Sequence, residues 1–220
     1  MNLPNAITAA RIAVAPLIAL LPFFATPTAR LAAFVLYVVA AVTDYWDGHL
    51  ARTRNLVTDL GRLLDPLADK LLLVATFVPM YALQRGPLLE AYAGATPLGD
   101  LRFVTPFGFV GLPWWVVAVV VGREAIMTIF RQVAARRGVV ISAIGPAKWK
   151  TAFQSIWVGS SYFWFMAVAF VRAYGWDNAG IRGFALFNGT VGTAAMVGAV
   201  ALTLYSLWLY FRRYGNVLRG

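Results

Sequence analysis

Four aspartates lie inside stretches of the chain that are otherwise apolar. Asp44 and Asp47 belong to one such stretch, and Asp65 and Asp69 belong to the next. A carboxylate at the centre of a membrane-spanning helix costs about 2.5–3.5 kcal/mol on insertion scales, so four unpaired carboxylates cost roughly 10 kcal/mol. These side chains therefore need partners that neutralise them, and a divalent metal ion is the most economical partner.

The spacing of the aspartates predicts one shared site. Asp44 and Asp47 are three residues apart and Asp65 and Asp69 are four apart, so each pair lies on one helix face. Because a short connection makes the two helices antiparallel neighbours, the pairs are expected to converge at similar depth. Four carboxylates at one depth form an all-oxygen site for Mg²⁺ or Mn²⁺. Two such ions about 3.5–4 Å apart form the usual clamp for displacement at phosphorus.

The composition places these residues in a membrane protein. Of the 220 residues, 60% are hydrophobic and only 13% are charged, which lies outside the range of soluble domains. Cysteine is absent, which excludes disulfides, thiolate metal sites and cysteine nucleophiles. In so apolar a chain, the net charge of +10 indicates attraction to anionic lipid headgroups or phosphorylated substrates, and we expect no nucleic-acid partner.

Six apolar segments are long enough to cross a bilayer at about 20 residues each. Only helices and closed barrels satisfy their backbone in lipid, and these runs lack the alternation of barrel strands, so all six are predicted to be helices. The predicted spans cover residues 5–25, 30–51, 62–84, 113–135, 148–172 and 185–211. We therefore expect one all-α membrane domain over residues 1–220, a bundle of six transmembrane helices. The imperfect GxxxG-like spacings Gly189–Thr193 and Gly192–Met196 hint at close helix packing in the last span.

Basic residues in the connections predict the orientation of the bundle. The connections after the second and fourth spans and the segment after the sixth carry Arg52, Arg54, Arg62, Arg136, Arg137, Lys148, Lys150, Arg212, Arg213 and Arg219. The opposite loops carry Arg30, Arg85, Arg102, Arg172 and Arg182. By the positive-inside rule the first set faces the cytoplasm, together with both termini. The sequence does not predict a structure for the glycine- and proline-rich loop over residues 85–112.

Small and basic residues surround the aspartates, and missing side chains leave room for a ligand against the helix backbones. The complete pattern is Asp44-x2-Asp47-Gly48-x2-Ala51-Arg52-x8-Gly61-x3-Asp65-x3-Asp69. At every fixed position it resembles the signature DxxDGxxAR-x8-GxxxDxxxD of the CDP-alcohol phosphotransferase family. The resemblance implies a six-helix membrane bundle, usually homodimeric, whose site opens to the cytoplasm. It also implies transfer of a substituted phosphate from a CDP-activated donor to an alcohol, with release of CMP.

The resemblance also implies roles for single residues. Asp44, Asp47 and Asp65 would hold metal, and Asp69 would both hold metal and take the proton from the attacking hydroxyl. Donor contacts carry over to Pro4, Asn5, Thr8, Gly48, Ala51, Arg52, Thr58 and Gly61. Asn5 is also a reasonable helix cap and Pro4 a helix-start residue, so a local helix role stays open for both.

Later motifs resemble those of bacterial phosphatidylglycerophosphate synthases. They are Gly122-Arg123-Glu124 with Arg131, Gly145-x2-Lys148-x-Lys150-Thr151, and the opening Asn2-Leu3-Pro4-Asn5-x2-Thr8-x2-Arg11. Arg123 and Arg131, near one helix face, are expected to bind the phosphate of glycerol 3-phosphate together with Lys148 and Lys150. Glu124 is expected to orient an arginine or to close a helix-packing contact. The implied reaction joins the phosphatidyl group of CDP-diacylglycerol to this acceptor at the bacterial inner membrane.

Two alternatives stay open. Within the family, the acceptor is inositol phosphate, inositol or serine, although serine needs none of these basic side chains. In a different class, a cation transporter uses the aspartates as an ion path. Transport favours carboxylates at the bilayer midplane, often on broken helices. Here they are predicted near one face of the membrane, beside small residues and Arg52, which favours nucleotide binding.

Overall fold

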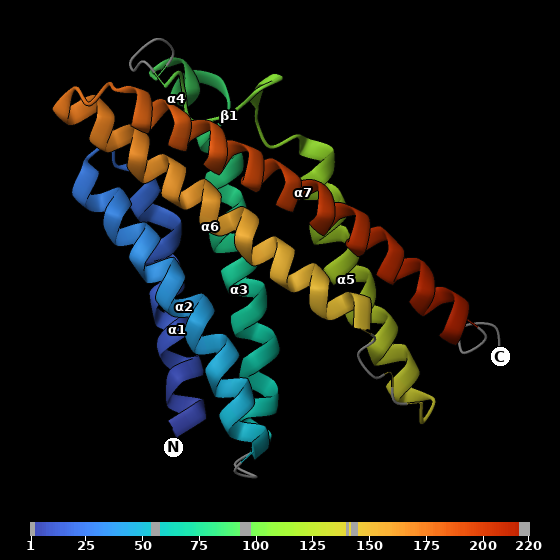
Figure 1. Ribbon diagram of the computed structural model, residues 1–220. Helices are drawn as coiled ribbons and strands as arrows, with labels where there is room; N and C mark the ends of the chain where they lie inside the picture. Colours follow the sequence, from blue (N-terminus) through green and yellow to red (C-terminus); the bar gives the residue numbers. More distant parts are fainter. Residues whose placement is uncertain (1–2, 54–57, 93–97, 140, 142–144, 216–220) are drawn as a thin grey trace.

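The structure is a computed structural model that describes residues 3–53, 58–92, 98–139, 141 and 145–215. Side chains are described throughout these ranges except at residues 3–4, 45, 47–53, 59–60, 62–63 and 146–148. Within this part of the chain, the long helices are α1 (Leu3–Leu20), α2 (Pro27–Thr53), α3 (Asp59–Leu83), α5 (Trp114–Arg136), α6 (Gly145–Tyr174) and α7 (Ala179–Tyr214) (Figure 1). Each of the six predicted spans corresponds to one of them, so the prediction of an all-α protein is confirmed.

Length and composition allow five of the described helices to cross a membrane. These segments are Asn5–Phe23, Pro27–Asp44, Leu64–Leu83, Trp149–Tyr174 and Ala179–Tyr214. Helix α5 is 23 residues long, which is enough to cross a bilayer, but Arg123, Glu124 and Arg131 interrupt its apolar sequence. The protein is therefore an integral membrane protein in which five of the long described helices carry an apolar segment long enough to span a bilayer.

Helix α6 joins the two sides of the bundle. Helices α1, α2 and α3 pack together, and α6 lies between α2 and α7, with α5 against α7 (Figure 1). Trp157, Tyr162 and Trp164 of α6 are almost fully buried. The Tyr162 hydroxyl donates to the carbonyl oxygens of Ile18 and Ala75, both at 3.1 Å, and so ties α6 to α1 and α3.

Local capping fixes where two helices begin. Thr58 precedes α3, and its hydroxyl accepts from the Gly61 backbone nitrogen at 3.0 Å. Asn178 precedes α7 and accepts from the Ile181 nitrogen at 2.9 Å. Each cap satisfies one of the backbone donors that the first helical turn leaves unpaired. The cap at Thr58 matters for function because α3 carries two of the aspartates.

The loop over residues 85–112 contains short elements that the sequence did not predict. They are α4 (Gly86–Glu90) and the antiparallel strands β1 (Phe103–Thr105) and β2 (Gly108–Val110). Strand β1 packs against α7 at two glycines, since a Cβ at Gly189 would collide with the Val104 carbonyl oxygen and one at Gly192 with the Phe103 ring. The small residues of the last span thus admit a hairpin rather than another helix.

We define the hairpin end as residues 98–112 with Gln84 and Trp164. Its polar side chains pair with the backbone or with a neighbouring side chain. Gln84 donates to the Leu101 carbonyl oxygen at 3.1 Å and accepts from the Leu112 nitrogen at 2.7 Å. The Trp164 indole donates to the Asp100 carbonyl oxygen at 3.2 Å. The Asp100 carboxylate accepts from Arg102, and this hydrogen bonding raises the pKa of the arginine.

Candidate active site

One face of α1 contacts both helices that carry the aspartates. The Thr8 hydroxyl donates to Asp65 Oδ1 at 3.0 Å. One turn further along, the Arg11 guanidinium donates to Asp44 Oδ1 and lies 3.6 Å from Asp69 Oδ1. Thr8 and Arg11 are both buried. Helix α1 therefore positions three of the four predicted metal ligands.

The predicted donor contacts Asn5, Thr58 and Gly61 meet where α1 approaches the start of α3. The Asn5 amide donates to the Thr58 hydroxyl at 2.9 Å. A Cβ at Gly61 would lie 2.9 Å from the Asn5 amide oxygen, which is closer than real Cβ contacts come. A side chain at position 61 would therefore displace the Asn5 amide, so glycine favours the close approach of the two helices.

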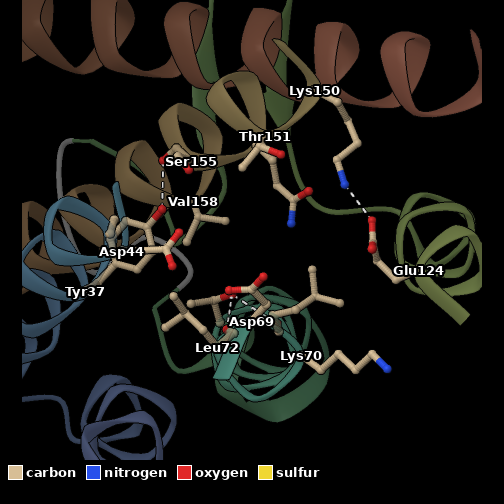
Figure 2. A pocket seen from close by; sticks show the side chains of 14 residues that line it. Tyr37, Asp44, Asp69, Lys70, Leu72, Glu124, Lys150, Thr151, Ser155 and Val158 are labelled. Atoms are coloured by element: carbon tan, nitrogen blue, oxygen red, sulfur yellow. Dashed lines mark hydrogen bonds and ion pairs between the residues drawn. The ribbon is translucent and has the colours of Figure 1, made fainter. Parts of the chain in front are cut away.

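A cavity of about 200 Å³ opens between α2, α3, α5 and α6 (Figure 2). Asp44 and Asp69 line one side of it, and Lys150 and Glu124 line the other. Between these sides, α6 presents a polar wall of Thr151, Gln154 and Ser155. The side chain of Asp69 is 66% exposed and that of Asp44 is 44% exposed. Both carboxylates are thus open to a ligand that enters the cavity.

The basic side of the cavity is organised by Glu124. Its Oε1 accepts from Lys150 Nζ at 2.5 Å and from the Arg123 guanidinium at 2.9 Å. Arg123 also donates to the Ser206 hydroxyl at 3.4 Å. Arg123 and Lys150 are both buried, which is costly for cations unless they are paired. The expectation that Glu124 orients an arginine is confirmed, and the same carboxylate also fixes the lysine.

Several predicted site residues lie outside the cavity lining, among them Arg123, Arg131 and Asp65. Arg131 is exposed and is not among the residues that line the cavity. Eight residues along a helix of 3.6 residues per turn leave a rotation of about 80°, which separates Arg131 from the buried Arg123. Asp65 is also outside the cavity lining and is held by Thr8 instead.

Six predictions fall on side-chain positions outside the described part of the structure. They concern Pro4, Asp47, Gly48, Ala51, Arg52 and Lys148.

The described residues offer oxygen ligands for a divalent cation. No group of three or more Asp, Glu or His side chains that could hold a metal occurs among the described residues, a set that omits the Asp47 side chain. Asp44 and Asp69 nevertheless meet around one positive group, the Arg11 guanidinium. Carboxylates without nitrogen or sulfur ligands suit Mg²⁺ or Mn²⁺. The carboxylate oxygens therefore fit a metal site, and so does the position of the positively charged Arg11 guanidinium between them.

Several residues at the site had no role predicted from the sequence. Arg11 was noted only as part of a motif, although a lone charge in an apolar span indicates a buried partner. The polar residues at positions 150, 151, 154 and 155 fall on one helix face, and that periodicity was a usable signal. Tyr37 completes the wall, since its hydroxyl donates to the Ser155 carbonyl oxygen at 2.9 Å (Figure 2).

The fold and the site together define a helical membrane protein with paired carboxylates and buried cations around one polar cavity. Residues 1–205 match the family described as CDP-alcohol phosphatidyltransferase. The chain belongs to this family and is an enzyme of this type. Enzymes of the family need divalent cations.

Curated relatives from several bacteria share this similarity. The CDP-diacylglycerol–glycerol-3-phosphate 3-phosphatidyltransferase of Bacillus subtilis (strain 168) is 36% identical over 171 residues, which cover 72% of this chain and 75% of the relative. A protein of the same name from Rickettsia typhi is 34% identical over 176 residues, covering 74% and 95%. A third from Cereibacter sphaeroides is 27% identical over 232 residues, covering 96% and 95%.

Proposed function

We propose that this protein transfers the phosphatidyl group from CDP-diacylglycerol to glycerol 3-phosphate, giving phosphatidylglycerophosphate and CMP. The observation that carries the proposal is one cavity with two chemically different sides, Asp44 and Asp69 facing Lys150 and Glu124. The carboxylate side suits a metal-bound diphosphate, and the basic side suits the phosphate of an acceptor. The names of the curated relatives, similar over most of this chain, support the same substrates.

Asp69 is proposed as the base because it is the more open of the two cavity aspartates. The acceptor hydroxyl oxygen forms a bond to the phosphorus that carries the diacylglycerol, its proton passes to Asp69, and the bond to the CMP oxygen breaks. Asp44, Asp47, Asp65 and Asp69 would hold two divalent cations, Mg²⁺ or Mn²⁺, which would neutralise charge on the diphosphate and on the leaving CMP.

The donor is proposed to bind beside the aspartates, where α1 meets the start of α3. The proposed donor contacts are Pro4, Asn5, Thr8, Gly48, Ala51, Arg52, Thr58 and Gly61. This placement is supported by Asn5 of α1, which contacts Thr58 and Gly61 at the start of α3. The amide of Asn5 and the hydroxyl of Thr58 suit a cytidine nucleotide, while the acyl chains of the donor remain in the surrounding lipid.

Lys150 and Arg123 are proposed to bind the acceptor phosphate, with Lys148 beside them. Lys150 lines the cavity, and Glu124 holds the buried Arg123 next to it, so the positive charges of both groups lie close together for a phosphate that arrives there. The exposed Arg131 is left out of this set because of its place on α5.

The protein is further proposed to lie in the bacterial inner membrane as a homodimer, with both termini and the cavity facing the cytoplasm. The excess of basic residues in the connections on one side supports this orientation. A cytoplasmic site also suits the substrates, since glycerol 3-phosphate and a cytidine nucleotide are both charged and water-soluble groups.

An acceptor screen tests the proposal. Purified protein is supplied with CDP-diacylglycerol, Mg²⁺ or Mn²⁺, and labelled glycerol 3-phosphate, serine, inositol or inositol phosphate in separate reactions. Labelled lipid and CMP are expected with glycerol 3-phosphate and not with the other three acceptors. Formation of phosphatidylserine or of an inositol lipid, without phosphatidylglycerophosphate, contradicts the proposed acceptor.

A further inference from the structure

Arg11 contacts the carboxylates at the site, yet the reaction proposed above gives it no task. Its side chain is 2% exposed, and its guanidinium donates to Asp44 and lies 3.6 Å from Asp69. It therefore bridges a residue of α2 and a residue of α3 from a third helix, α1. A buried arginine in an apolar span is costly, and this pairing compensates for the cost.

The guanidinium and a divalent cation are attracted to the same carboxylate oxygens. An oxygen that donates electron density to a metal is less available to a guanidinium, and two positive groups close together repel each other. Binding of metal at Asp44 or Asp69 and pairing with Arg11 must therefore oppose each other. The opposition is strong here because Arg11 is buried and poorly screened by solvent.

We propose that Arg11 is a positioning residue that serves as a resident cation for Asp44 and Asp69. It holds the two carboxylates together in the metal-free protein and lowers the affinity of the site for metal. The inference rests on the proposed function only in taking these aspartates as metal ligands.

The chemistry of the side chain suits this task. A planar guanidinium has several donors and can bridge two carboxylates from different helices, whereas an ammonium is a single point charge. On the same face of α1, Thr8 holds Asp65, so one helix face keeps three aspartates in place. Without Arg11, the negative charges of Asp44 and Asp69 repel each other whenever metal is absent.

Metal affinity without substrate is the direct test. The full-length protein in detergent is titrated with Mn²⁺, and free Mn²⁺ is followed by its electron paramagnetic resonance signal. We compare the wild-type protein with Arg11→Gln, Arg11→Lys and Arg136→Gln. The last removes the same charge from an exposed position at the end of α5, far from the aspartates in sequence. Circular dichroism and gel filtration establish that each variant is folded.

Arg11→Gln is expected to bind Mn²⁺ about tenfold more tightly than the wild type, because a competing cation is gone. Arg11→Lys is expected to lie between the two, and Arg136→Gln to match the wild type. The melting temperature of metal-free Arg11→Gln should fall, and Mn²⁺ should raise it by more than in the wild type. A purely structural arginine would lower the melting temperature without tightening Mn²⁺.

Unchanged or weaker Mn²⁺ binding in folded Arg11→Gln overturns the proposal, as does a wild-type protein that binds no Mn²⁺. Should Arg11→Gln fail to fold, Arg11→Lys decides alone, and an affinity equal to or below the wild type overturns the proposal. A wild-type protein that rejects glycerol 3-phosphate, while Arg11→Gln still binds Mn²⁺ more tightly, would remove the proposed acceptor and leave the role of Arg11 standing.

Discussion

The two ends of the molecule handle polar groups in opposite ways. At the hairpin end, polar side chains pair with the backbone or with near neighbours, as Gln84 does with Leu101 and Leu112. At the aspartate end, charged side chains pair across helices: Arg11 with Asp44, 33 residues away, and Lys150 with Glu124, 26 residues away. Pairs of charged side chains that stay partly open can be exchanged for a ligand, whereas buried bonds from a side chain to the backbone only hold the fold.

The largest expected effect is at the open carboxylate. Asp69→Asn should lower the rate of CMP release by about 10²–10⁴-fold, the usual contribution of a positioned base, while leaving the fold intact because the side chain is exposed. Donor binding should largely survive. Turnover with labelled glycerol 3-phosphate is the measurement, and Glu90→Gln, which removes an exposed carboxylate from α4, is the matched control. Full turnover in Asp69→Asn would remove it as the base.

A smaller effect is expected on the basic side of the cavity. Lys150→Gln should raise the KM for glycerol 3-phosphate by about 10–100-fold, because a charge-assisted contact to phosphate is lost. The KM for CDP-diacylglycerol should change little. Steady-state kinetics with each substrate varied in turn separate the two. Equal changes in both KM values would mean that Lys150 supports the whole cavity rather than the acceptor.

At the hairpin end, the loss of a polar side chain should change the stability of the protein and leave its activity unchanged. Gln84→Leu leaves a buried carbonyl and a buried backbone nitrogen without their partners, which costs about 1–3 kcal/mol. The melting temperature in detergent should therefore fall, while kcat and both KM values per folded molecule stay unchanged. A changed KM with an unchanged melting temperature would break the division between the two ends.

The smallest effect is expected at Arg131, where the sequence and the structure differ. Arg131→Gln should change the KM for glycerol 3-phosphate by less than about twofold, because an exposed charge far from the ligand is screened by solvent. A rise as large as that in Lys150→Gln would restore Arg131 to the acceptor site, as the motif alone suggests.

The aspartates were recognisable from sequence because their cost in an apolar segment is high and their spacing is regular. The positions of the helices followed from the length of the apolar runs. The sequence did not predict which charged side chains pair with each other, since Arg11 and Asp44 meet only when α1 packs beside α2. Motif spacing suggested that Arg131 shares a face with Arg123, but the helical rotation between them turns the exposed Arg131 away.

The hairpin was missed for a related reason. Its strands are only three residues long, and their packing depends on contacts with glycines some 85 residues further along the chain. Gly189 and Gly192 did signal close packing, yet small residues do not specify which element fills the space beside them.

We propose that one cavity holds a base on one side and a phosphate site on the other. It is tested most directly by the ratio of kcat/KM for glycerol 3-phosphate to that for glycerol, measured as CMP release in the wild type and in Lys150→Gln. We expect the variant to lose most of its preference for glycerol 3-phosphate while its activity with glycerol is unchanged. An equal loss with both acceptors would contradict it.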